Sequence, residues 1–571
     1  MTVALIVLAI ALLGLFALAV ARPWLGLLVL LAGLPFNGLL LHVGGSQLAL
    51  DGTSATMFAA WHDALAAGVI VAAGLQWLRA RPRSSGALEL GVVIVLALGL
   101  DSLVVTPHST TALYAYRTLF EPIALMLAVV VLGHGRRLPE DLPGRASLAI
   151  VVAAVAASFF TYWQIYIGSF SFLSQFYRAA DGSLSGAYLA VSILQPRAIG
   201  TFNSPNEFGA YLVIALCLLS VTAAVPSSGR WRAWALVPIG VALLLSISRS
   251  AWVSLFGAIL ILVVSLPNKR EHLRALRSRL RTLQWWRAFA PPLTLLVVLV
   301  AGIGVSTGVP NFIGATLDRT DPSASVHFRQ LSDLLGGNID NPAPTPTPTA
   351  LPAPSPSSAA PATAATPSLT PPITAASPAA TPAATPDPSA TPCPSATIDP
   401  PATADPSATA DPSATADPSA TPAGSAATLV PGVRYVTVCK EVSTGTHVEP
   451  FGMGLGAVGP KSDRFGETPL LLNSETWYLD YLWQAGYFGL AALLVLAAIV
   501  IRRLWRGRRN AMSRAALAAM LGIAAGALFI PVLDEPAIAI PLWTLVAFGL
   551  LAAEREQPAA AATATPAPEA A

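Results

Sequence analysis

The sequence predicts an all-α polytopic membrane protein with about 12–13 transmembrane helices. Of its 571 residues, 54% are hydrophobic and only 11% are charged, and the mean hydropathy is +0.63. A soluble protein carries charge on roughly a quarter of its residues, so this composition excludes an ordinary soluble domain. Many apolar runs also approach or exceed the ~18–20 residues that are needed to span a bilayer.

The apolar runs give the order of the predicted spans. They lie near 3–20, 24–42, 58–78, 88–106, 113–133, 147–166, 207–225, 232–247, 250–266, 288–306, 478–501, 512–531 and 537–553. The first run lacks a basic segment before it and a clear cleavage site after it, so we expect a retained span and not a signal peptide. Pro23 separates the first two runs, and Pro35 interrupts the second.

Arginine and lysine clusters predict the orientation of the chain. Basic clusters follow every second span, at 79–83, 134–145, 229–232, 268–287 and 502–509. Such loops face the cytoplasm, so the chain is expected in a plasma or inner membrane with the other loops outside. In the 268–287 cluster the leucines share one helical face, which is typical of a helix on the membrane surface.

The largest extracytoplasmic loop lies between the tenth and eleventh spans and contains a low-complexity insertion. Residues near 341–424 are almost entirely Pro, Ala, Thr and Ser, with a repeated DPSATA unit. Such a tract cannot bury a core and is expected to be disordered. The predicted division is 1–189 N-terminal helices, 190–337 first part of the core, 338–427 linker, 428–501 second part of the core, 502–556 C-terminal helices and 557–571 tail.

Polar and charged residues gather at the outer ends of the predicted spans. They are Asp63 in AWHDAL, Arg117 in YAYRTLFEP, Arg197, Asn203 and Asn206 in RAIGTFNSPNEFGAY (197–211), Arg249 in LSISRSAW, and Arg319 and Arg329 in the following loop. The positive-inside tendency disfavours arginine on this face. An anionic ligand would account for several arginines here, because guanidinium binds phosphate oxygens in a bidentate fork.

Each of these residues also has a purely structural interpretation. Arg117 could pair with Glu121 on its own helix, Asp63 could cap a helix, and Arg319 could pair with Asp321. The location of all of them on one face is a stronger indication than any single residue.

The chain resembles the O-antigen ligase and polymerase superfamily. The resemblance covers roughly residues 190–500. It rests on RAIGTFNSPNEFGAYL, LLLSISRSAWVSL, a large outer loop, FGMGLGAVG and NSETWYLDYLWQAGYFGL. It implies transfer of a glycan from an undecaprenyl pyrophosphate carrier to a lipid, protein or growing polysaccharide on the outer face, with no cofactor or metal.

The resemblance also implies roles for individual residues. Arg197 and Arg249 match the arginines thought to hold the pyrophosphate, and Arg329 matches an arginine at the start of the outer loop. Asn203 and Asn206 would order the segment and bind phosphate or sugar. Where the ligases carry a histidine, this chain has Glu475. Glu475 is the expected general base, and Asp480 is its reserve.

Several alternatives remain open at this point. A glycan polymerase of the same superfamily would use the same residues. A lipid flippase or transporter would also hold a lipid pyrophosphate, but it should show internal repeats or broken helices. A membrane-anchored Pro/Thr stalk would explain the insertion but not the arginines. The net charge of +3 does not suggest nucleic acid, and the three dispersed cysteines suggest no metal site.

Overall fold

The computed structural model describes residues 2–47, 52–80, 86–105, 109–166, 197–223, 231–266, 450–456 and 476–563. All described residues belong to one unit of the chain, Met1–Pro342 with Thr444–Ala571. They form helices and turns and contain no strand, so the all-α class is confirmed for them. The span predicted at 288–306, the basic segment 268–287 and the Pro/Thr insertion lie outside the described residues.

The N-terminal part of the chain forms a run of helices with two early interruptions. The elements are α1 (Thr2–Ala21), α2 (Pro23–Gly33), the 3-10 turn η1 (Leu34–Phe36), α3 (Asn37–Gln47), α4 (Gly52–Ala59), α5 (Trp61–Ala80), α6 (Gly86–Val105), α7 (Ser109–His134) and α8 (Leu142–Tyr166). Proline lacks an amide hydrogen and suits the first turn of a helix, which explains why α2 begins at Pro23. The interruption expected at Pro35 is present as η1.

The remaining described helices follow the gap after α8. They are α11 (Pro205–Ala223), α12 (Trp231–Leu245), α13 (Arg249–Val264), α18 (Trp477–Arg506), α19 (Ala511–Gly526), the 3-10 turn η3 (Val532–Asp534) and α20 (Pro536–Thr563). Ser248 and Asn510 cap α13 and α19, because each side chain accepts a hydrogen bond from a backbone amide of the first turn.

Seven of the described helical segments are long and apolar enough to cross a membrane. They are Ala4–Ala21, Pro23–His42, Gly86–Val104, Thr111–His134, Leu142–Gln164, Trp477–Arg506 and Pro536–Glu556. Four shorter apolar helices accompany them, at Pro205–Ser220, Trp234–Leu245, Arg249–Val264 and Ala511–Gly526. The chain is therefore a membrane protein, while the predicted number of spans and the sides of its loops stay predictions.

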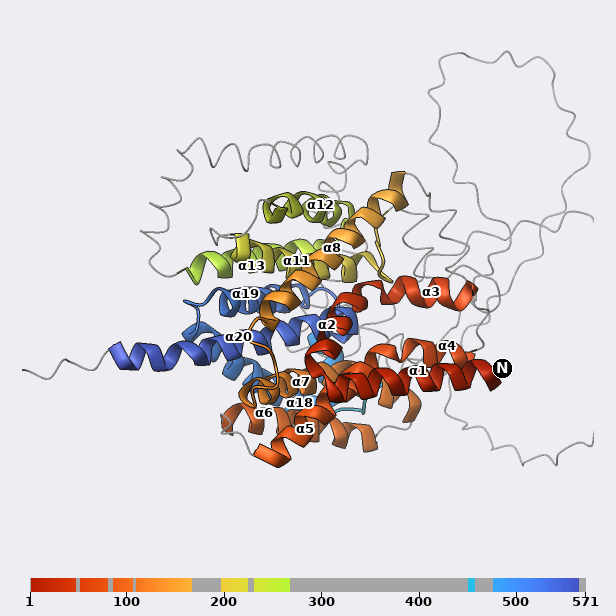
Figure 1. The fold of residues 1–571 in the computed structure, drawn as a ribbon, viewed down its shortest axis with the longest axis horizontal. Coiled ribbons are helices and arrows are strands. Elements are labelled where there is room, and N and C mark those ends of the chain that lie inside the picture. Colours follow the sequence, from red (N-terminus) through yellow and green to blue (C-terminus); the bar gives the residue numbers. More distant parts are fainter. Residues whose placement is uncertain are drawn as a thin grey trace, which may run out of the picture. The chain divides into compact units, whose positions relative to one another are not determined.

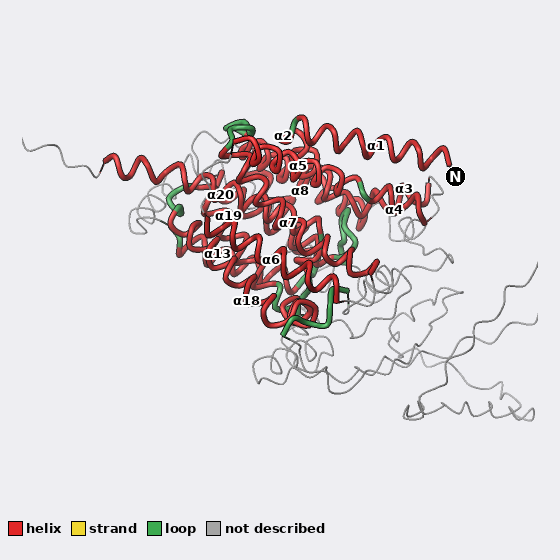
Figure 2. The backbone as a smooth tube through the Cα atoms, turned by 90° about the horizontal axis from the view of Figure 1, so that it is seen from below, coloured by secondary structure: helices red, strands yellow, loops and turns green. Residues whose placement is uncertain are grey.

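The helices pack with α20 at the centre and α1 at the edge (Figures 1 and 2). In the apolar window of α20, 83% of the residues are buried, against 6% in α1. Helices α13 and α19 approach closely because glycines face a neighbouring backbone. A Cβ added at Gly522 would lie 2.5 Å from the carbonyl oxygen of Ser254. Small residues at such crossings are typical of membrane helices.

Candidate functional site

A short turn between α12 and α13 forms the floor of the first polar cluster. Leu245 ends α12, and Arg249 begins α13 after Ser246, Ile247 and Ser248. Ile247 has a φ of 48°, a left-handed conformation that is rare for a β-branched residue. Such strain is found most often at functional sites.

Arg197 lies over this turn and binds its carbonyl groups. The Nη2 atom donates to the carbonyl oxygen of Ile247 at 2.8 Å, and Nε donates to that of Ser246 at 3.3 Å. Carbonyl groups at the end of α12 lack helical partners, so the guanidinium satisfies them. The first arginine of RAIGTFNSPNEFGAY is thereby fixed to the segment LSISRSAW.

Asn206 joins the two segments a second time. Its Oδ1 atom accepts from Ser248 Oγ at 2.8 Å and from Arg197 Nη2 at 3.4 Å. Ser248 Oγ also lies 3.1 Å from Ser250 Oγ. We refer to Arg197, Asn206, Ser248 and Arg249 as the arginine cluster.

The electrostatics of the arginine cluster favour an anion. Burial and the positive charge of Arg249 lower the pKa of Arg197 to about 10, so the Arg197 guanidinium stays charged at neutral pH. None of the described residues forms an ion pair with Arg197. The amino-terminal ends of α11 and α13 add positive potential, because the helix dipole is positive there.

The loop at 197–204 is held from the other side by the interrupted helix α2–η1–α3. Thr201 Oγ1 donates to the carbonyl oxygen of Pro35 at 2.5 Å, and the amide of Leu39 donates to the carbonyl oxygen of Thr201 at 3.0 Å. Gly38 lies against Asn203, since an added Cβ would be 2.8 Å from its Oδ1 atom. Asn203 thus lies against Gly38, in a part of the chain that is distant in sequence.

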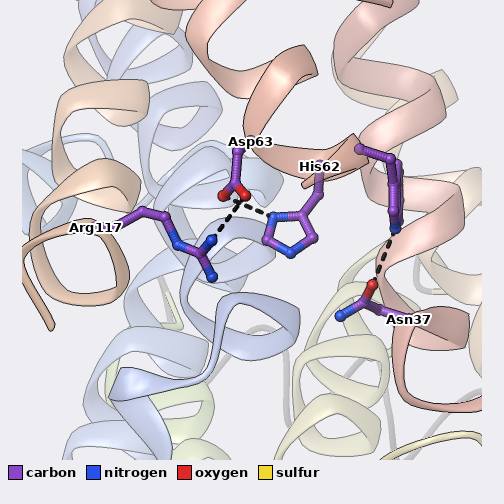
Figure 3. Close-up of polar contacts among 5 residues, drawn as sticks. Asn37, His62, Asp63 and Arg117 are labelled. Carbon is purple, nitrogen blue, oxygen red and sulfur yellow. Dashed lines mark hydrogen bonds and ion pairs between the residues drawn. The ribbon is translucent and has the colours of Figure 1, made fainter. Parts of the chain in front are cut away.

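Asp63 and Arg117 belong to a second polar cluster, between α5 and α7 (Figure 3). Arg117 Nη1 and Asp63 Oδ2 are 2.8 Å apart, and His62 Nδ1 lies 3.1 Å from Asp63 Oδ1. Glu121 lies near both charged groups. Asp63 therefore forms an ion pair across two helices. We refer to His62, Asp63, Arg117 and Glu121 as the α5–α7 cluster.

A hydrogen bond next to the α5–α7 cluster leads back to the interrupted helix. Trp61 Nε1 donates to Asn37 Oδ1 at 2.9 Å, and Asn37 is labelled in Figure 3. Asn37 precedes Gly38, which lies against Asn203. The two clusters are therefore connected through one short segment, residues 34–38.

Asp480 lies in a short helical section that precedes a break in α18. The backbone of Gly486 leaves the helical region, with φ 69° and ψ −175°. The section before it is anchored at one end, because the amide of Trp477 donates to the carbonyl oxygen of Ala527 at 3.0 Å. In the middle of this section, the ring centroid of Tyr481 lies 6.3 Å from that of Phe120 in α7. Asp480 is buried in this section.

The glycine-rich motif at 450–456 fits into the break in α18. The amide of Met453 donates to the carbonyl oxygen of Trp483 at 2.8 Å, and the amide of Phe488 donates to that of Pro450 at 3.1 Å. Gly456 N donates to Gln484 Oε1 at 3.1 Å. Backbone groups that the break frees are thus satisfied by the motif, as burial in a membrane protein requires.

The reasoning from sequence missed two groups of residues. Asn37 and His62 adjoin the predicted residues but carry no motif of their own. Asp534 accepts a hydrogen bond from Trp477 Nε1, and its turn η3 contacts α7, α11 and α18. An acidic pair between two prolines, PVLDEP (531–536), was the available signal at the start of the last span.

The structure thus brings Arg197, Asn206 and Arg249 together, places Asn203 against Gly38, and pairs Asp63 with Arg117. Glu475, Arg319 and Arg329 lie outside the described residues. In the part of the chain that is described, no group of His, Cys, Asp or Glu side chains could hold a metal ion. No family model, curated protein or solved structure matches the chain.

Proposed function

We propose that this membrane protein transfers a glycan from an undecaprenyl pyrophosphate carrier to an acceptor on the extracytoplasmic face. The acceptor is a lipid, a protein or a growing polysaccharide. The observation that supports the proposal is the arginine cluster, in which two guanidinium groups share a partly buried position at two helix starts. Guanidinium groups bind phosphate oxygens in a bidentate fork, so two of them in one place suit the pyrophosphate of the carrier.

The arginine cluster would act on the leaving group. Negative charge develops on the pyrophosphate as the bond to the sugar breaks. Donors that are fixed before the reaction stabilise that charge without reorganising. Arg197 is held in this way by the carbonyl groups of Ser246 and Ile247. Its remaining hydrogen-bonding capacity and the charge of Arg249 are directed to the ligand.

The acceptor hydroxyl must lose a proton as it attacks the anomeric carbon. Glu475 is the proposed base, and it directly precedes Thr476, whose hydroxyl donates to the carbonyl oxygen of Leu528 at 3.1 Å. Asp480 on the next turn is the reserve. A single displacement of this kind inverts the configuration at the anomeric carbon. A polymerase would use the same steps with a growing glycan as acceptor.

A transporter of lipid-linked glycan is the second candidate, and one observation favours it. Two of the described helices are discontinuous, α2–η1–α3 at residues 34–38 and α18 at Gly486, and broken helices are frequent in transporters. The two functions differ in product. Transfer forms a new glycosidic bond, whereas transport only moves the carrier between leaflets.

The test uses the full chain in lipid nanodiscs with a lipid pyrophosphate glycan and a candidate acceptor. Arg197→Lys and Arg249→Lys keep the charge but lose the bidentate fork, so both should weaken carrier binding and turnover. Glu475→Gln should keep binding and lower turnover roughly 10²–10⁴-fold. Arg145→Lys is the matched control, because Arg145 is an exposed arginine whose partner is Asp141.

Carrier binding that is unchanged in both cluster variants would rule out the pyrophosphate assignment. A wild-type protein that moves carrier across proteoliposomes but forms no glycosidic bond would favour the transporter.

A further inference from the structure

Thr201, from the loop at 197–204, takes part in the backbone hydrogen bonding at the interruption between α2 and α3. In a regular helix the amide of Leu39 donates to the carbonyl oxygen of Pro35, four residues earlier. Here both groups bond to Thr201. The amide of Leu39 donates to its carbonyl oxygen at 3.0 Å, and its hydroxyl donates to Pro35 O at 2.5 Å. Thr201 is buried, so water does not replace these bonds.

Gly38 provides the space for this contact. An added Cβ would lie 2.8 Å from Asn203 Oδ1, 2.9 Å from the carbonyl oxygen of Thr201 and 3.0 Å from the carbonyl carbon of Phe202. Two of these atoms belong to the backbone and cannot rotate away. Any side chain at position 38 therefore shifts the loop at residues 201–203.

Backbone hydrogen bonds connect the loop to the end of α12, so a shift at Thr201 reaches the arginine cluster. The amide of Phe202 donates to the carbonyl oxygen of Ile199 at 3.1 Å, and the amide of Ala198 donates to that of Leu245 at 3.0 Å. Gly200, between them, has a φ of 58°. Arg197 lies shortly before this turn, and Asn206 lies three residues after Asn203, which touches Gly38.

We propose that Gly38 and Thr201 are positioning residues for the arginine cluster and that the interruption at residues 34–38 is built to hold them. This inference rests on the proposed function, because the ligand of the cluster is taken to be the pyrophosphate of the carrier. It assigns a role in ligand binding to N-terminal helices that lie outside the region of family resemblance.

Three variants of the full chain in nanodiscs test the proposal, with glycan-free undecaprenyl pyrophosphate as the binding probe. Thr201→Val keeps the shape of the side chain but removes the hydroxyl. We expect it to lower affinity about tenfold, the size expected for one buried hydrogen bond. Thr201→Ser keeps the hydroxyl and should stay within about threefold of wild type. Gly38→Ala should lower affinity at least as much as Thr201→Val.

Two controls separate positioning from a general loss of structure. Gly74→Ala is the matched glycine variant, because its added Cβ meets no atom within 4 Å, and it should bind as wild type does. In the transfer reaction, Thr201→Val should raise the KM for the carrier and leave the KM for the acceptor unchanged. If Gly38→Ala does not yield monodisperse protein, Thr201→Val and Thr201→Ser decide the question.

The outcomes also separate this inference from the proposed function. If wild type does not bind the probe, or if Arg197→Lys binds it as tightly as wild type, the pyrophosphate assignment fails. If Arg197→Lys weakens binding while Thr201→Val and Gly38→Ala bind normally, the positioning role is wrong and the proposed function stands. Equal loss in Thr201→Val and Thr201→Ser would also overturn the role of the hydroxyl.

Discussion

Two described membrane helices are interrupted, and each interruption receives a loop from a distant part of the chain. At residues 34–38 the loop is 197–204, and at Gly486 it is 450–456. The first loop is held by the Thr201 hydroxyl, by one backbone bond from Leu39 and by Gly38, whose backbone is ordinary. The second is held mainly by backbone groups, together with the Gln484 side chain, and by glycines with positive φ, 80° at Gly452 and 69° at Gly486.

The difference shows two ways of burying irregular backbone in a membrane protein. Every freed amide and carbonyl group needs a partner, because the membrane interior offers no water. A contact made by a side-chain hydroxyl can change when one residue is substituted, so single substitutions can alter the geometry of the first interruption. A contact between two backbones admits no side chain, so the second depends on glycine. The first interruption adjoins the charged clusters, whereas the second is a tightly packed joint.

The largest expected effect distinguishes the two glycines. Gly486→Ala places a Cβ 2.3 Å from the amide nitrogen of Gly452 and the carbonyl oxygen of Pro450, in a left-handed conformation. We expect the free energy of unfolding to fall by about 3 kcal/mol or more, because the conformational strain adds to a backbone clash. For Gly38→Ala the free energy of unfolding should fall by about 1–3 kcal/mol.

Thermal unfolding of the detergent-solubilised protein measures both glycine variants, with Gly74→Ala as the control. A Gly486→Ala variant that is as stable as Gly38→Ala would show that the joint at Gly486 relaxes easily.

The sequence predicted the helices better than it predicted their interruptions. Apolar length indicates a helix reliably because each span must satisfy its own backbone hydrogen bonds. Pro35 signalled the first break, since proline cannot complete the helical pattern. Nothing in WQAGYFG (483–489) distinguishes Gly486 from a helical glycine, because its conformation depends on the distant 450–456 segment.

The candidate site was predictable in part for a similar reason. Arg197, Asn206 and Arg249 lie in segments that the sequence singled out, and short turns bring them together. The pairing of Arg117 with Asp63 depends on how α5 packs against α7, so sequence spacing favoured Glu121 on the same helix. The roles of Thr201 and Gly38 depend on the contact between an interrupted helix and a loop that are far apart in the chain.

A smaller effect is expected at the ion pair that adjoins the first interruption. Asp63→Asn removes the carboxylate that pairs with Arg117, and both side chains are mostly buried, with 21% and 31% of their surface exposed. We expect a loss of about 2 kcal/mol, less than for a fully buried pair, because Glu121 lies close enough to replace part of the interaction.

The double variant Asp63→Asn/Arg117→Gln tests that pairing. It should lose less stability than the sum of the two single variants, because the second change removes a partner that is already lost. Additive losses would mean that the pair contributes no coupling. The ion pair beside the interruption at residues 34–38 would then not stabilise the fold.

A further prediction compares the loss of stability when one amide side chain is removed at each interruption. Gln484→Ala removes the acceptor of the buried Gly456 amide, and Asn37→Ala removes the acceptor of the partly buried Trp61 indole. A buried donor without a partner costs about 1–3 kcal/mol, whereas a donor that reaches water loses about 0.5–1.5 kcal/mol. We therefore expect Gln484→Ala to be the more destabilising change in thermal unfolding. The opposite order would indicate that the joint at Gly486 is open to water.

The smallest expected effect is the pH dependence of carrier binding near neutral pH, which depends on the charge of Arg197. Burial and the charge of Arg249 lower the pKa of Arg197 from its ordinary value to about 10, so the side chain keeps its proton up to about pH 10. Affinity for undecaprenyl pyrophosphate should change little between about pH 8 and 9, and it should fall by up to about tenfold per pH unit above 10.

Folding stability should respond in the opposite direction over the same range. Between about pH 10 and 12.5 the unfolded chain binds a proton at Arg197 that the folded chain has released. This residue therefore contributes increasing stability as the pH rises through that window. The variant Arg197→Gln lacks the titrating group, so subtracting its pH profile from that of wild type isolates the contribution of Arg197. Identical profiles for binding and stability in the two proteins would show that Arg197 is not held beside Arg249 as the arginine cluster requires.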